Sequence, residues 1–115
     1  MSEPERSRAI HFAYAEAAIP GPGGERSLAF LRRGSLEIKL SRPLPPNRQT
    51  PHTQDEIYVI ARGGGVLIHD GKRESVQAGD CIFIAAGTDH RFEDFSEDLA
   101  VWVVFYGPAG GELPG

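Results

Sequence analysis

The sequence lacks the features of several common protein classes. It holds a single cysteine, Cys81, which excludes an internal disulfide framework and a cysteine-based zinc ribbon or finger. No stretch approaches the ~20 apolar residues that a membrane-spanning helix needs, and the charged first residues lack the apolar run of a secretion signal. Lys and Arg number 12 against 16 Asp and Glu, a net charge of −4, so no basic stripe is available for nucleic acid. We therefore expect a small cytoplasmic protein that binds neither nucleic acid nor a membrane.

Glycine and proline are abundant, with 14 and 9 of the 115 residues, which favours turns over a helical bundle. Apolar and polar residues alternate in Ser35–Ser41, as in a half-buried strand. Turn signals recur every 8–12 residues, a spacing typical of an all-β sandwich or barrel. We expect further strands at Ile10–Ala15, Leu28–Leu31, Glu56–Ala61, Val66–His69, Lys72–Val76, Cys81–Ala85, Arg91–Phe95 and Leu99–Tyr106, with helical potential at Tyr14–Ala18.

We expect a single domain over residues 1–115, with its core at about 27–106 and flexible ends at 1–8 and 107–115. Asp70-Gly71 predicts a tight hairpin turn. Cys81 is expected to be a small buried apolar residue.

The segment Leu99–Tyr106 has two apolar faces, because Val101, Val103 and Phe105 alternate with Trp102, Val104 and Tyr106. A strand in a one-layer barrel wall is expected to have a polar outer face. Either the N-terminal segment, through Phe12 and Tyr14, covers the second face, or another subunit does. We favour a homodimer, because exposed apolar strips usually mark interfaces.

Two histidines and a glutamate stand out as candidate metal ligands. His52 and Glu56 are four residues apart, which keeps both side chains on one face of an extended segment, and His90 follows 34 residues after Glu56. Two imidazoles and one carboxylate form the facial triad that binds Fe(II) and related metals with open positions. The same set can hold zinc with an open fourth position. The alternative is a solvated turn histidine beside a strand carboxylate.

At these residues the sequence resembles the cupin superfamily, specifically its small single-domain members of the cupin 2 type. The first cupin motif is matched from its second histidine onward: His52, three residues, Glu56, six residues, then Gly63. The second motif keeps its spacing throughout, from Gly79 through Gly87 and His90. The resemblance implies an all-β, double-stranded β-helix or jelly-roll barrel with short N-terminal strands and a site inside one end.

The resemblance also implies that His52, Glu56 and His90 hold one divalent transition metal, such as Fe, Mn, Zn or Ni. This chain departs from the cupin pattern at Thr50, which replaces the first motif histidine, a strong nitrogen donor. Gln54, on the same face if the strand begins early, and Gln49 are candidates to compensate, although an amide oxygen is a weaker ligand than imidazole.

We expect a metal-dependent enzyme acting on a small organic molecule, with its reaction class, oxygenase, isomerase, decarboxylase or lyase, left open. Glu56 and Tyr58 are the candidate catalytic residues: Glu56 as a general base if the site is metal-free, and Tyr58 as an inward hydrogen-bonding group or a core tyrosine. The alternative is a non-catalytic ligand-binding or sensor protein that uses the same pocket. A third possibility is a purely structural dimer whose barrel is filled by Phe83, Phe92 and Ile60.

Overall fold

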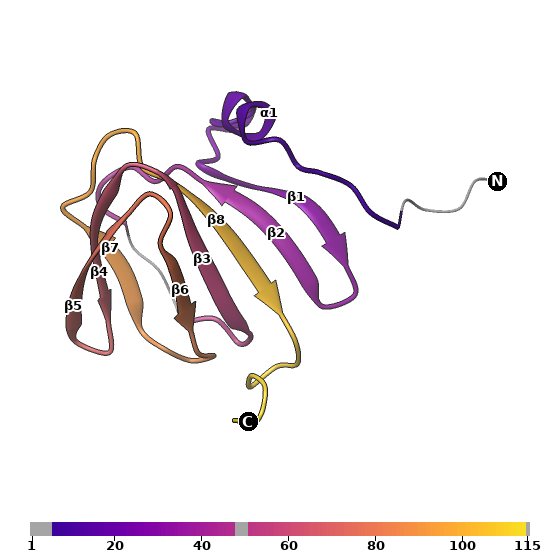
Figure 1. The fold of residues 1–115 in the computed structure, drawn as a ribbon, viewed down its shortest axis with the longest axis vertical. Helices are drawn as coiled ribbons and strands as arrows, with labels where there is room; N and C mark the ends of the chain where they lie inside the picture. The colour runs from indigo at the N-terminus through magenta and orange to yellow at the C-terminus, as the bar shows by residue number, and fades with distance from the viewer. Residues whose placement is uncertain (1–5, 48–50, 115) are drawn as a thin grey trace.

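We describe the protein from a computed structural model, which places residues 6–47 and 51–114. Within these ranges the chain forms one short helix and eight strands (Figure 1). They are α1 (Phe12–Ala17), β1 (Ser27–Arg33), β2 (Leu36–Ser41), β3 (Asp55–Arg62), β4 (Gly64–His69), β5 (Lys72–Gln77), β6 (Cys81–Ile84), β7 (His90–Glu93) and β8 (Ala100–Tyr106). In this part of the chain no helix is long and apolar enough to cross a membrane.

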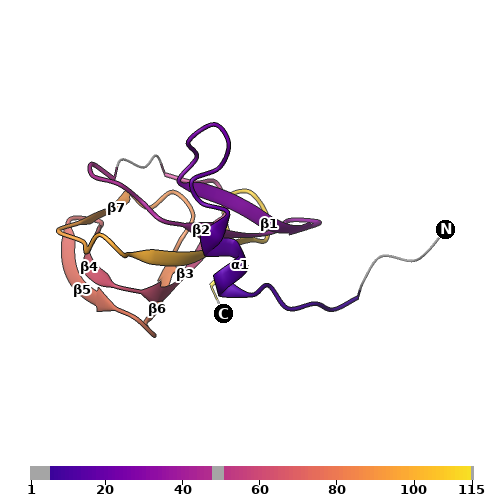
Figure 2. The same cartoon turned by 90° about the horizontal axis from the view of Figure 1, so that it is seen from above.

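The strands form two antiparallel sheets, one of five strands in the order β1-β2-β8-β3-β6 and one of three in the order β5-β4-β7. Seen from above, the sheets curve around a shared interior, and β1 and β2 extend beyond it (Figure 2). The main core lies between them and consists of Tyr58, Ile60, Leu67, Val76, Ile84, Phe92, Leu99, Val101 and Val103. This arrangement confirms the predicted all-β jelly-roll fold.

Glycine shapes the two ends of β4. The hairpin from β4 to β5 turns at Asp70 and Gly71, which both have positive φ (49° and 77°), as two-residue hairpin turns require. At the other end, Gly63 also has positive φ and packs so tightly that an added Cβ would collide with Ser96 Oγ. A larger residue at Gly63 would therefore push apart the connection between the two sheets.

The predicted strand Ile10–Ala15 is wrong, because this segment enters helix α1 at Phe12. Its sequence, FAYAEA, is rich in alanine, the best helix former, and Phe12, Ala15 and Ile19 lie at spacings that bring them to one side of the segment. That side packs on Leu40 and the neighbouring outer face of the large sheet. Tertiary packing and helix propensity therefore both favour a helix here, and they outweigh the short strand-like pattern of apolar residues in Ile10–Ala15.

The expectations for Cys81 and Phe83 are also wrong. Cys81 is exposed and Phe83 is 59% exposed. Both lie on β6, where Ile82 is the residue that packs against the core. Phe83 therefore does not fill the barrel, and the barrel retains a cavity, described below.

The two apolar faces of β8 have different partners. Val101 and Val103 belong to the main core, whereas Trp102 is covered by Phe12 of α1 in an edge-on ring contact with centroids 6.2 Å apart. The N-terminal segment thus covers the part of the second face around Trp102. Val104, on the same outer face, is not part of the apolar cluster around α1. A second subunit could cover it, and the homodimer remains a prediction.

The C-terminal segment is held more firmly than expected. Gly107 N donates to Ser35 Oγ, Gly110 N to the Thr53 carbonyl, and Glu112 N to Asp55 Oδ2 at 2.8 Å. Asp55 is buried and also accepts from Ala86 N at 2.9 Å. These two backbone donors lower the pKa of Asp55 below its ordinary value. Residues 107–112 therefore follow the end of the barrel instead of extending away from it.

Candidate metal centre

Three different segments bring the candidate ligands together. Glu56 is the second residue of β3, His90 is the first residue of β7, and His52 lies in the segment that leads into β3. One ligand atom from each residue can be chosen so that all three atoms lie within 4.8 Å of one another. The predicted proximity of His52, Glu56 and His90 is therefore confirmed.

Glu56 and His90 are almost fully shielded from solvent. The His90 Nε2 atom lies 3.1 Å from Glu56 Oε1, with side-chain exposures of 0% and 2%. Neither atom has a hydrogen bond of acceptable geometry among the described residues. At the other side of the ring, His90 Nδ1 lies 2.8 Å from the Thr88 carbonyl oxygen. Since a carbonyl only accepts, this contact assigns the proton to Nδ1.

This assignment leaves two lone-pair atoms facing each other in the neutral form of His90. Two such atoms at 3.1 Å repel unless a proton or a cation lies between them. Burial acts to lower the pKa of His90, but the Glu56 carboxylate and the Thr88 carbonyl outweigh burial and raise it above its ordinary value. The site thus favours positive charge at Nε2.

The residues fit a metal ion by their chemistry as well as by their proximity. Two imidazoles and a carboxylate suit Fe, Mn, Zn or Ni and leave coordination positions open. The Thr88 carbonyl orients the His90 ring from behind, as partners of metal-bound histidines commonly do. The His52 ring is supported by Phe105, with centroids 4.7 Å apart.

A cavity of about 480 Å³ adjoins these residues and is lined by His52, Glu56, Tyr58 and Phe92 among others. This volume lies within the range of small-molecule pockets. Tyr58 is buried, as its shared face with Glu56 predicted, and its ring lies 5.8 Å from the His90 ring and 5.2 Å from that of Phe92. A small molecule in the cavity would contact both the ligand set and Tyr58.

Gln54 directs its amide nitrogen to backbone carbonyls. Its amide nitrogen donates to the Ser35 and Gly107 carbonyls at 3.0 and 2.9 Å. The prediction assumed an early strand, but β3 begins only at Asp55, so the alternation of faces does not extend back to Gln54. Gln49 and Thr50 lie outside the described residues.

The polar side of the cavity was not predicted from the sequence. Four polar residues line the cavity: Arg26 just before β1, Ser27 at the start of β1, and Lys39 and Ser41 on β2. The alternation in β2 was recognised, but it does not say which face turns inward. The apolar face packs toward α1 through Leu40, and the polar face lines the cavity.

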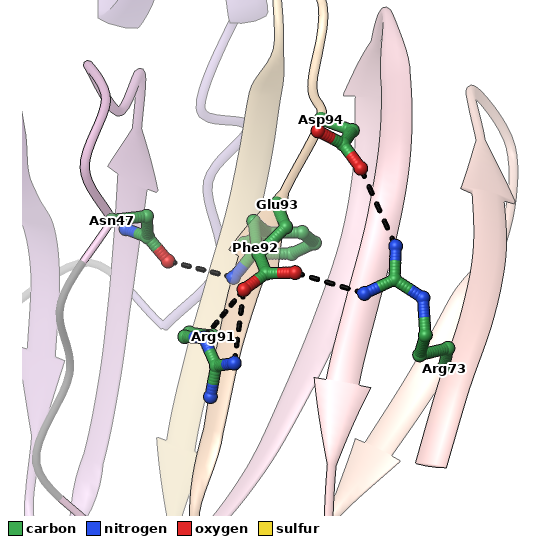
Figure 3. Close-up of polar contacts among 6 residues, drawn as sticks. All are labelled: Asn47, Arg73, Arg91, Phe92, Glu93 and Asp94. Atoms are coloured by element: carbon green, nitrogen blue, oxygen red, sulfur yellow. Dashed lines mark hydrogen bonds and ion pairs between the residues drawn. The ribbon is translucent and has the colours of Figure 1, made fainter. Parts of the chain in front are cut away.

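Asn47 attaches the segment after β2 to the edge of the small sheet. Its Oδ1 accepts from Phe92 N at 2.8 Å, as Figure 3 shows. On the same strand, Glu93 accepts from Arg91 and Arg73, and Arg73 also reaches Asp94. Hydrogen bonds from Arg91 and then Arg73 lower the pKa of Glu93 below its ordinary value. This network lies beside the cavity and contributes no metal ligand.

The comparisons with known proteins agree with this fold. The cupin domain family matches residues 43–106, and the chain belongs to that family. The chain is 34% identical over 83 residues to the uncharacterised protein SCO3923 of Streptomyces coelicolor, covering 70% of this chain and 79% of that protein.

Among solved structures, protein NMB1881 of Neisseria meningitidis superposes with a TM-score of 0.69 at 16% identity, covering 87% of this chain and 100% of that one. A cupin-2 domain protein of Shewanella frigidimarina gives a TM-score of 0.67 at 15% identity, covering 83% and 91%. At these identities the structures establish the shared fold.

Proposed function

We propose that the protein is a metal-dependent enzyme that acts on a small organic molecule in the cavity beside His52, Glu56 and His90. One observation carries this proposal. The buried His90 Nε2 and Glu56 Oε1 atoms lie 3.1 Å apart, have no hydrogen bond of good geometry among the described residues, and face the same small space as His52. A divalent transition metal satisfies all three groups at once.

A metal held there would supply Lewis acidity or a bound hydroxide to a substrate through its open positions. The chain's own residues supply position and exclusion of water. Glu56 and His90 are fixed by burial, and the Thr88 carbonyl sets the His90 ring. Tyr58 lines the cavity, its ring lies 5.8 Å from that of His90, and it is the candidate to hydrogen-bond the substrate. The reaction class, whether oxygen chemistry, isomerisation, decarboxylation or elimination, depends on the metal and the substrate.

Metal content per chain tests the proposal directly. We expect about one equivalent of Fe, Mn, Zn or Ni by mass spectrometry in tag-free protein, and its loss in both His52→Ala and His90→Ala. His11→Ala is the matched control, because His11 is exposed and lies before α1, away from the ligand set. Absence of bound metal after reconstitution, in a folded protein, would refute the proposal.

A non-catalytic binding or sensor role is the second candidate. The apolar part of the cavity wall favours this role. There β8 contributes Val101, Val103 and Phe105, a surface that can bind a ligand by shape. Glu56→Gln separates the two roles, since it keeps the shape and removes the charge. An enzyme loses turnover in this variant, whereas a shape-driven binder keeps its ligand affinity.

We also propose that the protein is a homodimer. Paired residues on the outer face of the large sheet form an apolar row of Ile38, Val104, Ile57 and Phe83 across four strands. Phe83 is exposed, and none of the four belongs to the cluster around α1. A second copy that pairs the same row in a two-fold arrangement would bury it.

A further inference from the structure

The inner face of β2 carries a cation into the cavity. Lys39 pairs in register with Val103 of β8, and Val103 pairs in turn with Tyr58 of β3. Residues paired in this way lie on the same face of a sheet, and neighbouring strands are about 4.8 Å apart. Lys39 therefore starts about 10 Å from Tyr58, on the same inner surface, and its flexible stem shortens that distance.

Polar neighbours surround Lys39 on this side. Ser27 and Ser41 form a cross-strand pair, and both line the cavity with Lys39. Arg26 lines it too, with its Nε held by the Arg42 carbonyl at 2.8 Å. The cavity thus has two walls: an apolar wall from β8 and a cationic, hydroxyl-bearing wall from β1 and β2.

The charges in the cavity do not balance. Of the described residues that line it, Glu56 has the only carboxylate, against the two cations Lys39 and Arg26. A divalent metal at the ligand set would add further positive charge. The cavity therefore favours an occupant with negative charge.

Lys39 forms no ion pair with the described residues. The nearest acid on its own strand face is Glu37, whose Oε2 accepts from Arg32 Nε at 2.6 Å. Both Glu37 and Lys39 border a smaller hollow beside His52, so Lys39 lies between that hollow and the main cavity. A lysine on the inner face of a barrel, without a structural carboxylate, is placed to hold a ligand.

We propose that the cavity binds a small organic anion, whose acidic group contacts Lys39 with the hydroxyls of Ser27 and Ser41 and whose remainder extends toward His52, Glu56 and His90. This inference rests on the proposed function and specifies its substrate class. The apolar side chains of Val101, Val103 and Phe105 line the cavity between the two ends and contact the uncharged part of the anion.

Two probes of almost equal shape test the proposal: benzoate, which is anionic, and benzamide, which is neutral. Each is titrated into the full chain by heteronuclear NMR, once with metal removed by a chelator and once after loading with zinc. We expect benzoate to bind ~10-fold more tightly than benzamide in both forms, because a hydrogen bond to a charged group adds about one tenfold step in affinity. The shifts should centre on the cavity-facing residues of β1, β2 and β8.

Variants at Lys39 assign the effect to this side chain. In the metal-free protein, Lys39→Met removes the charge and should abolish the preference for benzoate, whereas Lys39→Arg keeps the charge and should retain it. Lys72→Met is the matched control, because Lys72 is exposed on β5 and does not line the cavity. A preference retained in metal-free Lys39→Met would overturn the proposal, as would equal or absent binding of the two probes to the wild-type chain.

The two metal states separate this inference from the proposed function. If the metal fails to bind but the metal-free protein still prefers benzoate through Lys39, the anion site stands and the metal-dependent function fails. If metal binds to the three ligands but benzoate has no advantage, the anion site fails and the metal centre stands.

Discussion

His90 Nε2 and Glu56 Oε1 lie 3.1 Å apart, with almost no exposure of either side chain to solvent. Burying a carboxylate costs free energy unless it is paired, and here its nearest partner nitrogen carries no proton in the neutral ring. The pair is therefore an electrostatic site that needs a positive charge. A bound metal ion would supply that charge, and His52 lies close enough to be a third ligand.

Metal removal should lower the stability of the protein. A ligand that binds only the folded state stabilises it by about 4 kcal/mol at 1,000 times its Kd. We expect thermal unfolding at lower temperature after chelation, and recovery when the metal is restored. His52→Ala, which leaves the buried pair in place, should abolish this response to metal. An unchanged unfolding temperature on chelation of a metal-loaded sample would contradict the prediction.

Phe12→Ala should destabilise the fold without affecting the metal centre. Phe12 contacts Trp102 on the outer face of the large sheet, and its ring also lies under the Arg62 guanidinium at 4.9 Å. Phe12 is only half-buried, so we expect a loss of about 2 kcal/mol, below the 3–5 kcal/mol typical of fully buried Phe→Ala changes. Urea unfolding measures this loss, and Trp102 fluorescence should shift to the red.

Tyr14→Ala is the control for that experiment. Tyr14 is on the same helix and contacts Phe30, but it is 71% exposed. Tyr14→Ala should lower the free energy of unfolding clearly less than Phe12→Ala does. Equal losses would mean that α1 docks as a whole and that Trp102 is not its anchor.

The metal site was predictable because its signal is local in sequence. The spacing of His52, Glu56 and Gly63, and of Gly79, Gly87 and His90, matches the two cupin motifs. The resemblance therefore suggests the ligand set, which the even spacing of His52 and Glu56 alone does not. Gln54 could not be placed in this way, because its position depends on where β3 begins. Its hydrogen bonds to Ser35 and Gly107 come from segments distant in sequence.

The polar cavity wall could not be predicted for a different physical reason. Alternation in β2 separates Lys39 and Ser41 from Leu40, but Leu40 packs in the cluster with α1, whereas Lys39 and Ser41 line the cavity. Which face turns inward depends on where the helix packs, and the helix itself was expected to be a strand. The general rule that apolar residues face the barrel interior therefore assigns β2 to the wrong orientation.

Glu93 should contribute stability that is lost in acid. Its pKa in the folded protein is lowered below the ordinary value of 4.5 by Arg91 and Arg73. The unfolded chain therefore binds this proton at higher pH than the folded protein does. The contribution is fully present above about pH 4.5 and disappears as the pH falls through the lower, folded pKa. Comparing the free energy of unfolding of wild type and Glu93→Gln across pH 3–7 measures it.

The expected difference in free energy of unfolding is small at neutral pH, because the Glu93 carboxylate is partly exposed. It vanishes at the acid end, because the carboxylate is then protonated. Asp70→Asn is the matched control, because Asp70 is exposed in the β4–β5 turn and has no ion pair with the described residues. A Glu93→Gln difference that grew as the pH fell would reverse the predicted sign.

Phe83→Asp should convert the protein to a monomer while leaving metal content unchanged. Phe83 ends the outer row that continues through Ile57, Val104 and Ile38, and it faces away from the cavity. A charge there would be buried in the proposed interface, where an unpaired carboxylate is strongly unfavourable. Light scattering coupled to size exclusion should give twice the chain mass of 12.5 kDa for wild type and a single chain for the variant.

Tyr14→Asp serves as the control for this change, since it places the same charge on another exposed aromatic outside the row. It should remain dimeric. If wild type itself has the mass of one chain at all concentrations, the apolar row is not an interface between copies. If Phe83→Asp stays dimeric with full metal content, the two subunits meet elsewhere, because an unpaired carboxylate buried in an apolar contact would not leave the association intact.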